Sequence, residues 1–313
     1  MNTTQYEHRP VLLNEVLQGL NIHADGCYID CTFGRGGHCR SILALLNEGG
    51  RLFAIDKDPE AIRSVAKDLS TDKRFSLFHG SFTMLNKIVE SNNLQHQVNG
   101  ILFDLGVSSP QLDDPERGFS FRNDGCLDMR MDNSTGLTAA EWIKTSSESE
   151  IEKVLIQYGE ERFARKIAKA IVITRSKTDI CTTRQLADLI AATVPFREND
   201  KHPATRTFQA IRIFINRELE EIEQALTQTI DILAAGGRLV VISFHSLEDR
   251  IVKRFIRNQA RGDNYPAEVP IPKLFIRPKL KVIGKKAYPD QTEVDRNPRA
   301  RSAVLRIAER LAS

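Results

Sequence analysis

Short apolar runs alternate with amphipathic segments in the first third of the chain. The runs are rich in Ile, Leu, Val and Phe, which is typical of strands buried on both faces of a parallel sheet. They cover residues 27–33, 51–56, 75–79 and 99–105. The intervening segments from His38 to Leu46 and from Pro59 to Leu69 predict helices. Strands that alternate with helices imply right-handed crossovers, and therefore an α/β fold with a doubly wound sheet.

The strand pattern stops near Asp113, and only helices are predicted from there to about Asn199. Two of them begin with the spacing of a capping box, at Thr138 and at Ser147. A third carries an apolar stripe that includes Ile167, and the fourth covers residues 183–192. We therefore expect an all-helical domain at 113–199, inserted between two parts of one α/β domain, 1–112 and 200–313.

The α/β pattern resumes after residue 200. A long helix is predicted from about Ala204 to Ala234, with a break near Asn216. The further predicted elements are a buried strand at 238–243, a helix at 246–257, and strands at 279–283 and 302–308. Ser246 and Asp249 have the spacing of a capping box for the second of these helices.

A glycine-rich turn leaves the first predicted strand. Residues 30 to 38 read Asp-Cys-Thr-Phe-Gly-Arg-Gly-Gly-His. Glycine at a strand-to-helix turn lets a ligand approach the backbone closely, because no Cβ blocks it. The next strand ends in a second carboxylate, Asp56, at a spacing that suits a ribose diol. The two features together predict a nucleoside-binding site, and a purely structural turn is the alternative.

The identity of the nucleoside follows from the acid that precedes the loop. The dinucleotide pattern G-x-G-x-x-G is incomplete, because Cys39 stands where the third glycine belongs. Asp30, at the end of the first strand, would repel a pyrophosphate but would attract an ammonium group. S-adenosylmethionine (SAM) has an ammonium group, a sulfonium and no phosphate. The sequence therefore favours SAM over NAD.

The charge of the chain is unevenly distributed. The net charge is only +3, but residues 251–313 contain 15 Lys or Arg and 6 Asp or Glu, a net +9. A basic terminal segment indicates a polyanionic partner such as nucleic acid, with a solvated surface as the alternative. We expect Arg254, Arg257, Lys279, Lys281, Lys285 and Lys286 to contact RNA phosphates.

The cysteines and the N-terminus bear on the cellular compartment. The 5 cysteines include no C-x-x-C pair, so we expect no disulfide framework and no metal site. The N-terminus lacks a signal-peptide pattern, and no apolar run approaches the ~20 residues that cross a bilayer. These features predict a cytoplasmic protein with no membrane partner.

The candidate chemistry follows the fourth and fifth predicted strands. Asp104 ends the fourth strand, where a carboxylate can accept a proton from an amine that is being methylated. Either Phe119 or Phe121 suits stacking on a flipped base, and packing inside the helical domain is the alternative. His245 follows the fifth strand and is a second candidate for substrate contact. His202 to Arg206 precedes a helix and is either a cap or a phosphate clamp.

Several long segments of the chain resemble the bacterial MraW family of SAM-dependent 16S rRNA cytosine-N4 methyltransferases. The resemblance spans nearly the whole chain, in the order of the family's motifs. The segments that carry it are 30–38, Asp104-Leu-Gly-Val-Ser-Ser-Pro-Gln-Leu-Asp-Asp114, Arg117-Gly-Phe-Ser-Phe121, Leu127-Asp-Met-Arg-Met131, Tyr158-Gly-Glu-Glu-Arg-Phe163, His202-Pro-Ala-Thr-Arg-Thr-Phe-Gln-Ala210, 242–250 and Asn297-Pro-Arg-Ala-Arg301.

The resemblance implies a class I (Rossmann-like) SAM methyltransferase sheet with an inserted helical domain that recognises RNA. The partner it implies is 16S rRNA, modified at the decoding region of the small ribosomal subunit. The SAM contacts of the family fall here on Gly36, Gly37, His38, Asp56, Phe82, Asp104 and Gln111.

The catalytic proton acceptor does not follow from the resemblance. DNA enzymes that methylate amines carry Asp/Ser-Pro-Pro-aromatic after the fourth strand, whereas this chain has Asp104-Leu-Gly-Val. Asp104 is our candidate, and Ser108, Ser109 and His245 are the next ones. A non-catalytic, SAM-sensing assembly factor that binds RNA is the alternative function. A methyltransferase for proteins or small metabolites is a third, which the basic segment disfavours.

Overall fold

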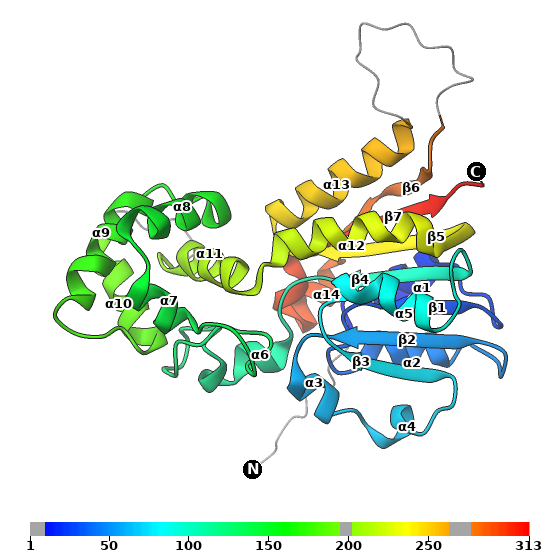
Figure 1. The fold of residues 1–313 in the computed structure, drawn as a ribbon, viewed down its shortest axis with the longest axis horizontal. Helices are drawn as coiled ribbons and strands as arrows, with labels where there is room; N and C mark the ends of the chain where they lie inside the picture. The colour runs from blue at the N-terminus through cyan, green and yellow to red at the C-terminus, as the bar shows by residue number, and fades with distance from the viewer. Residues whose placement is uncertain (1–9, 195–201, 263–276, 313) are drawn as a thin grey trace, which may run out of the picture. The chain divides into compact units, whose positions relative to one another are not determined.

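The computed structural model describes residues 10–194, 202–262 and 277–312. The chain forms two compact units. The first unit combines Met1–Gly106 with Leu219–Ser313, and the second is Val107–Glu218 (Figure 1). The first unit contains a seven-stranded sheet. In the described part of the second unit, helices are joined by loops, with an isolated bridge between Cys126 and Thr182.

The sheet has the strand order β3-β2-β1-β4-β5-β7-β6. The first five strands in this order are parallel, while β7 runs antiparallel to both of its neighbours. The predicted α/β class is therefore confirmed, with an antiparallel pair at one edge. The strands are β1 (Cys27–Asp30), β2 (Arg51–Asp56), β3 (Phe75–His79), β4 (Val98–Asp104), β5 (Leu233–Ser243), β6 (Leu280–Ala287) and β7 (Val304–Arg310).

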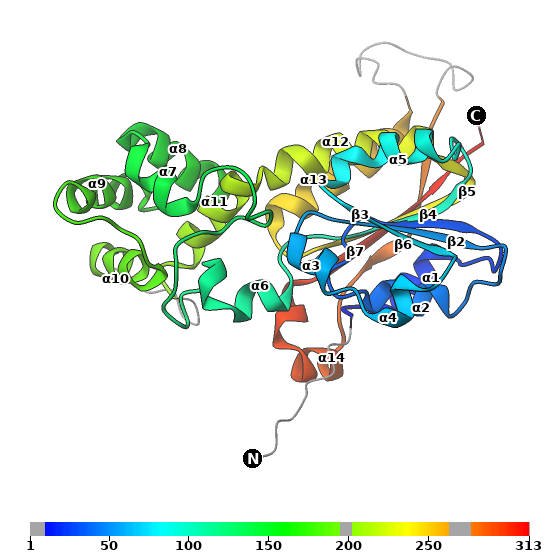
Figure 2. The ribbon, with the colours of Figure 1, turned by 60° about the horizontal axis from the view of Figure 1, so that its bottom comes forward.

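Helices cover both faces of this sheet (Figure 2). One face packs against α1 (Leu13–Leu20), α2 (Gly37–Leu43), α3 (Pro59–Arg63) and α4 (Lys67–Ser70). The other packs against α5 (Leu85–Ser91), α12 (Glu218–Ile232) and α13 (Ser246–Arg261). The short elements of this unit are η1 (Phe82–Met84), α14 (Gln291–Arg296) and η4 (Pro298–Ser302).

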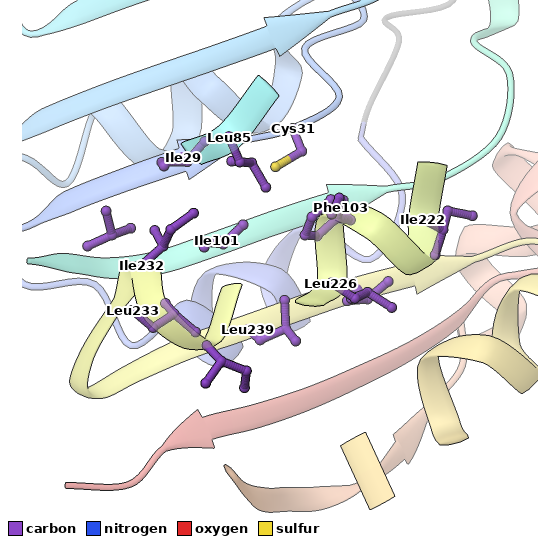
Figure 3. Packing of buried hydrophobic residues seen from close by; sticks show 14 of the residues in the cluster. Ile29, Cys31, Leu85, Ile101, Phe103, Ile222, Leu226, Ile232, Leu233 and Leu239 are labelled. Carbon is purple, nitrogen blue, oxygen red and sulfur yellow. The ribbon is translucent and has the colours of Figure 1, made fainter. Parts of the chain in front are cut away.

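Alternate residues of the central strands supply the two cores. On β4, Ile101 and Phe103 point into the cluster with α12, while Leu102 belongs to the cluster on the opposite face (Figure 3). Leu226 of α12 packs in the first of these clusters. Burial of such side chains stabilises the fold by about 1.5–3 kcal/mol each, which fixes the strand ends that carry the site.

The second unit contains five α-helices of seven residues or more among its described residues. Four of its helices begin at a capping box, in which a Ser or Thr and the side chain three residues later satisfy each other's backbone N–H groups. The elements are α6 (Ser109–Asp113), η2 (Pro115–Arg117), α7 (Ala139–Thr145), α8 (Glu148–Gly159), α9 (Ala164–Arg175), α10 (Thr183–Thr193) and α11 (Thr205–Asn216).

Three element boundaries differ from the prediction. The helix expected at 59–69 is two short helices, α3 and α4. The strand β5 begins at Leu233, ahead of the glycine pair that was expected to end the preceding helix. The cap of α13 is His245 rather than Ser246. The predicted break near Asn216 is confirmed, because Arg217 adopts a left-handed conformation between α11 and α12. No described helix is long and apolar enough to cross a membrane.

Candidate active site

Three carboxylates end three adjacent strands of the sheet. Asp30, Asp56 and Asp104 are the last residues of β1, β2 and β4. β1 lies between the other two and pairs with both in parallel register. Ligands bind at the carboxyl ends of strands in open parallel sheets, at the point where the strand order reverses. The strand order reverses at β1, so these acids stand at that point.

The glycine loop is tied to the acid of β2. The backbone N–H of Gly34 donates to Asp56 Oδ2 at 2.6 Å, and the N–H of Asp58 donates to Asp56 Oδ1 at 2.8 Å. Each carboxylate oxygen still has a second lone pair. Asp56 can therefore hold the loop and also accept hydrogen bonds from two ribose hydroxyls.

Burial raises the pKa of Asp56 to about 6. Desolvation is the largest cause, because it disfavours the charged carboxylate, and the two backbone hydrogen bonds partly oppose it. A carboxylate held in this way is a strong acceptor for a ligand that restores hydrogen bonds to it.

Asp30 has a different position from the one the sequence suggested. Its side chain is 1% exposed, and it accepts hydrogen bonds from the Thr32 N–H at 3.0 Å and from Cys39 Sγ at 3.1 Å. Burial raises its pKa as well. The structure thus shows Asp30 holding the loop from inside, and not facing a ligand ammonium group.

Thr32 connects Asp30 of β1 to Asp104 of β4. Its hydroxyl accepts a hydrogen bond from the backbone N–H of Asp104 at 2.7 Å. Because Thr32 is also bound to Asp30, the start of the loop and the end of β4 are held together by one side chain.

His38 lies next to Asp104, with its Nε2 atom 3.6 Å from Asp104 Oδ2. The imidazole is 5% exposed and sits in the first turn of α2. Neither ring nitrogen has a hydrogen-bond partner among the described residues, nor does Asp104 Oδ1, although all three atoms are buried. Buried polar atoms of this kind are costly unless a ligand satisfies them. They are the clearest indication of a binding site in this unit.

The three glycines of the loop have different environments. A Cβ on Gly36 would lie 2.6 Å from Leu69 Cδ1, and one on Gly37 would lie 2.5 Å from Pro10 Cγ. Gly34 has φ +56° and an open surrounding, since its nearest neighbour would be the Thr32 carbonyl oxygen at 4.0 Å. A side chain at Gly34 would therefore have open space beside it, whereas a side chain at Gly36 or Gly37 would overlap Leu69 or Pro10.

Phe82 lies beside the end of β4. Its ring contacts the Phe103 ring edge-on, with centroids 5.5 Å apart. It is only partly buried, so one part of the ring packs against the core and another part remains accessible. An aromatic ring in this position suits an adenine base.

Glu221 of α12 links the two loops that carry Asp56 and Phe82. Its Oε1 accepts from Lys57 Nζ at 2.7 Å, and its Oε2 accepts from Ser81 Oγ at 2.8 Å. Lys57 follows Asp56 in the chain, and Ser81 precedes Phe82. No sequence motif indicated this role for Glu221, because its partners lie 164 and 140 residues away.

The remaining predicted contact, Gln111, belongs to the second unit. There it closes the capping box of α6, with its Oε1 accepting from the Ser108 N–H at 2.9 Å. Its side chain is buried.

Two polar side chains, Arg117 and Asn216, hold the loops of the second unit in place. Arg117 is 6% exposed and donates to the carbonyl oxygens of Arg130 and Met131. Asn216 donates to the Met129 carbonyl at 2.7 Å and accepts from the Met131 N–H at 2.7 Å. These contacts give a structural role to two of the segments that resemble the MraW family, 117–121 and 127–131.

The aromatic candidates for base stacking are packed within the second unit. The Phe121 ring lies 4.7 Å from the His202 ring and 4.8 Å from the Phe208 ring, centroid to centroid. Phe119 is buried, with the Arg117 guanidinium over its ring. His202 Nδ1 accepts from the Ala204 N–H at 3.2 Å, but the N-cap of α11 is Ala204, which makes no side-chain cap hydrogen bond.

His245 also has a structural role. As the cap of α13 it accepts from the Glu248 N–H at 3.4 Å, and Glu248 accepts from the His245 and Phe244 N–H groups. Asp249, the expected partner of Ser246, instead forms a two-bond ion pair with Arg306.

The sequence matches the model of the MraW methylase family over residues 5–311. The chain belongs to the MraW methylase family. An rRNA methylase from Streptococcus thermophilus is similar in structure at 12% identity, with 96% of this chain and 94% of that chain covered and a TM-score of 0.42. NSun6 from Pyrococcus horikoshii, solved with SFG, is similar at 14% identity, with 97% and 53% covered and a TM-score of 0.43. At these scores the assignment rests on the family match.

The cofactor of this MraW methylase is SAM. The first unit offers what that molecule requires: an open glycine turn at Gly34, an acid for the ribose at Asp56, an aromatic ring at Phe82, and an unpaired buried acceptor at Asp104 Oδ1. When bound, SAM supplies an electrophilic methyl group. We propose that these four residues contact SAM.

Proposed function

We propose that this MraW methylase transfers the methyl group of SAM to the exocyclic N4 of a cytosine in the decoding region of 16S rRNA. The substrate would be the rRNA within the small ribosomal subunit, in the cytoplasm. The family assignment supports methyl transfer, and the long motifs that the chain shares with the family support the target base.

The observation that carries the chemistry is the buried, unpaired Oδ1 atom of Asp104. The lone pair of cytosine N4 is delocalised into the ring, so the amine is a poor nucleophile. In the transfer, the N–C bond forms as the S–C bond breaks, the sulfonium becomes a thioether, and one N4 proton must leave. Asp104 lies at the end of β4, and its carboxylate would accept that proton and stabilise the positive charge that develops on nitrogen.

His38 supports this role. Its Nε2 atom lies 3.6 Å from Asp104 Oδ2 and restricts the position of that carboxylate, while the Thr32 hydroxyl accepts a hydrogen bond from the backbone N–H of the same residue. The residues that act on SAM and those that act on the amine would then meet at one strand end.

The test uses purified protein with SAM labelled on the methyl group. Small subunits from a strain that lacks this gene and naked 16S rRNA are offered separately, and the labelled nucleoside is identified after digestion. We expect label in N4-methylcytidine, at one position. Label in another nucleoside would contradict the N4 assignment. Binding of SAM and RNA without any transfer would instead support a non-catalytic assembly factor.

A further inference from the structure

The edge strand β6 carries a bulge that ends at the same edge of the sheet as Asp104. Between Ile283 and Ala287, β6 advances four residues while its partner β7 advances only two, from Ile307 to Leu305. Gly284 permits this with φ +64° and open space around its α carbon. The bulge displays the exposed side chains of Lys285 and Lys286.

The strand register places this bulge near the reaction site. Asp104 of β4 pairs with Ile242 of β5, Ile242 pairs with Leu305 of β7, and Leu305 pairs with Ala287 of β6. Three strand spacings of ~4.8 Å put Ala287 roughly 14 Å from Asp104 along this row. Tyr288 follows directly, at the carboxyl edge of the sheet.

Tyr288 is an exposed aromatic ring among cations. Its relative exposure is 52%, and Lys286 Nζ lies 4.9 Å from the ring centroid. Aromatic rings beside Lys or Arg are the elements with which proteins bind single-stranded nucleic acid, because every base has a π-face that can stack. Lys286 and Tyr288 thus present a cation and an aromatic ring on one exposed surface.

The helix α13 adds further basic side chains next to those of β6. Its end is joined to the start of β6, since the Lys279 N–H donates to the Gln259 carbonyl oxygen at 2.9 Å, and the two elements lie side by side (Figure 1). Among the described residues 250–262 and 277–289 there are ten Lys or Arg and no Asp or Glu. The exposed ones on α13 are Arg250, Lys253, Arg254, Arg257 and Arg261.

We propose that the β6 platform, defined as Lys281, Lys285, Lys286 and Tyr288, binds a single-stranded stretch of RNA that flanks the methylated base. Tyr288 stacks on one nucleotide of this stretch. The lysines and the basic face of α13 bind phosphates along the same stretch. At roughly 14 Å from Asp104, the stacked nucleotide is a near neighbour of the target in the chain and not the target itself. This inference rests on the proposed function, because it assumes that the substrate is RNA.

The test measures RNA binding and methyl transfer with four variants of the full chain. The probes are the naked 16S rRNA and the small subunits used above, together with a uridine oligonucleotide. Tyr288→Ala should weaken RNA binding about tenfold or more, since loss of one stacked base has an effect of that size. Tyr288→Phe should bind as the wild type does, because it keeps the ring.

The double reversal Lys285→Glu with Lys286→Glu should weaken binding and flatten its salt dependence, by a slope of roughly 0.7 for each lost phosphate contact. The matched control is Lys67→Glu with Lys73→Glu. It reverses two exposed charges beside β3, at the opposite edge of the sheet, and should leave the slope unchanged. SAM affinity should stay the same in every variant, which also reports that each one is folded.

Two results would overturn the platform. One is RNA affinity in Tyr288→Ala equal to that of Tyr288→Phe and the wild type. The other is weaker binding to intact subunits with normal binding to naked RNA, which would assign the surface to an acidic ribosomal protein. Failure of the wild type to methylate RNA at all would instead contradict the proposed function.

Discussion

The backbone N–H of Gly34 donates to the Asp56 carboxylate at 2.6 Å, so the glycine loop is joined to the acid that ends β2. The loop leaves β1 and the acid ends β2, which lies next to it in the sheet. This hydrogen bond thus fixes the spacing between the glycine turn and the carboxylate that we propose binds the ribose.

Replacement of this acid should weaken cofactor binding. In Asp56→Ala, the ribose hydroxyls of SAM lose their charge-assisted hydrogen bonds to the carboxylate. The binding free energy should weaken by about 1.5–3 kcal/mol, or roughly 10- to 150-fold in Kd. Titration calorimetry measures it. Asp68→Ala removes an exposed carboxylate of the same unit and serves as the control. A folded Asp56→Ala protein with unchanged affinity would remove Asp56 from the site.

The affinity for SAM should depend on pH in the wild type. Because burial raises the pKa of Asp56 to about 6, the carboxylate form predominates above that pH and the protonated form below it. The protonated acid offers the ribose one acceptor fewer. Affinity should therefore fall by up to about tenfold between pH 7.5 and 5. The fall should be smaller in Asp56→Ala, and equal falls in the two proteins would assign it to another group.

The loop glycines should separate binding from stability. Gly34→Ala places a methyl group in open space above the loop, so the protein should fold, with a cost of about 1–2 kcal/mol for its positive φ, and bind SAM poorly. Gly36→Ala and Gly37→Ala should lose stability instead, because their Cβ atoms would overlap Leu69 and Pro10. Thermal unfolding and SAM titration on all three variants give the comparison. Normal SAM affinity in a folded Gly34→Ala would contradict the loop role.

Glu221 should act on SAM affinity without acting on the chemical step. It connects the loops of Asp56 and Phe82 through Lys57 and Ser81. Glu221→Ala should raise the KM for SAM several-fold and leave kcat at saturating SAM near the wild-type value. Glu221→Gln keeps the hydrogen bond to Ser81 and should recover part of the affinity. A kcat loss as large as the KM change would indicate general damage to the fold.

Asp104→Asn should affect turnover more than SAM affinity. The variant keeps the shape of the side chain but loses the charge that, in our proposal, accepts the amine proton. Single-turnover methyl transfer at saturating SAM should fall by about 10²- to 10⁴-fold, the usual contribution of a positioned acid or base. Near-normal turnover under these conditions would confine Asp104 to cofactor binding. The search for the acceptor would then move to Ser108, Ser109 and His245.

The sequence predicted the strand ends well because each is a local feature. Asp56 and Asp104 each close an apolar run, and parallel strands bring such ends to one edge of the sheet. The partners of Glu221 were not predictable, since they lie far away in the chain and no motif links them. The contact between Cys39 and Asp30 likewise depends on how α2 packs against β1.

Cap and loop positions were harder to predict for another reason. His245 caps α13 with its ring nitrogen. The residues usually found at caps are Ser, Thr, Asp and Asn, and this preference predicts Ser246 as the cap instead. Gly36 and Gly37 fit a ligand pattern in the sequence, yet the atoms that exclude a side chain there belong to Phe33, Leu69 and Pro10. Packing of this kind is visible only in three dimensions.

The most direct test of the account is mass spectrometry of 16S rRNA from cells that lack the gene. The account predicts that one base methyl group is lost, from N4 of a cytosine in the decoding region. It also predicts that the wild-type gene restores this methyl group and that the Asp56→Ala gene, expressed at the same level, does not. An rRNA methylation pattern identical to that of the parent strain would contradict the account.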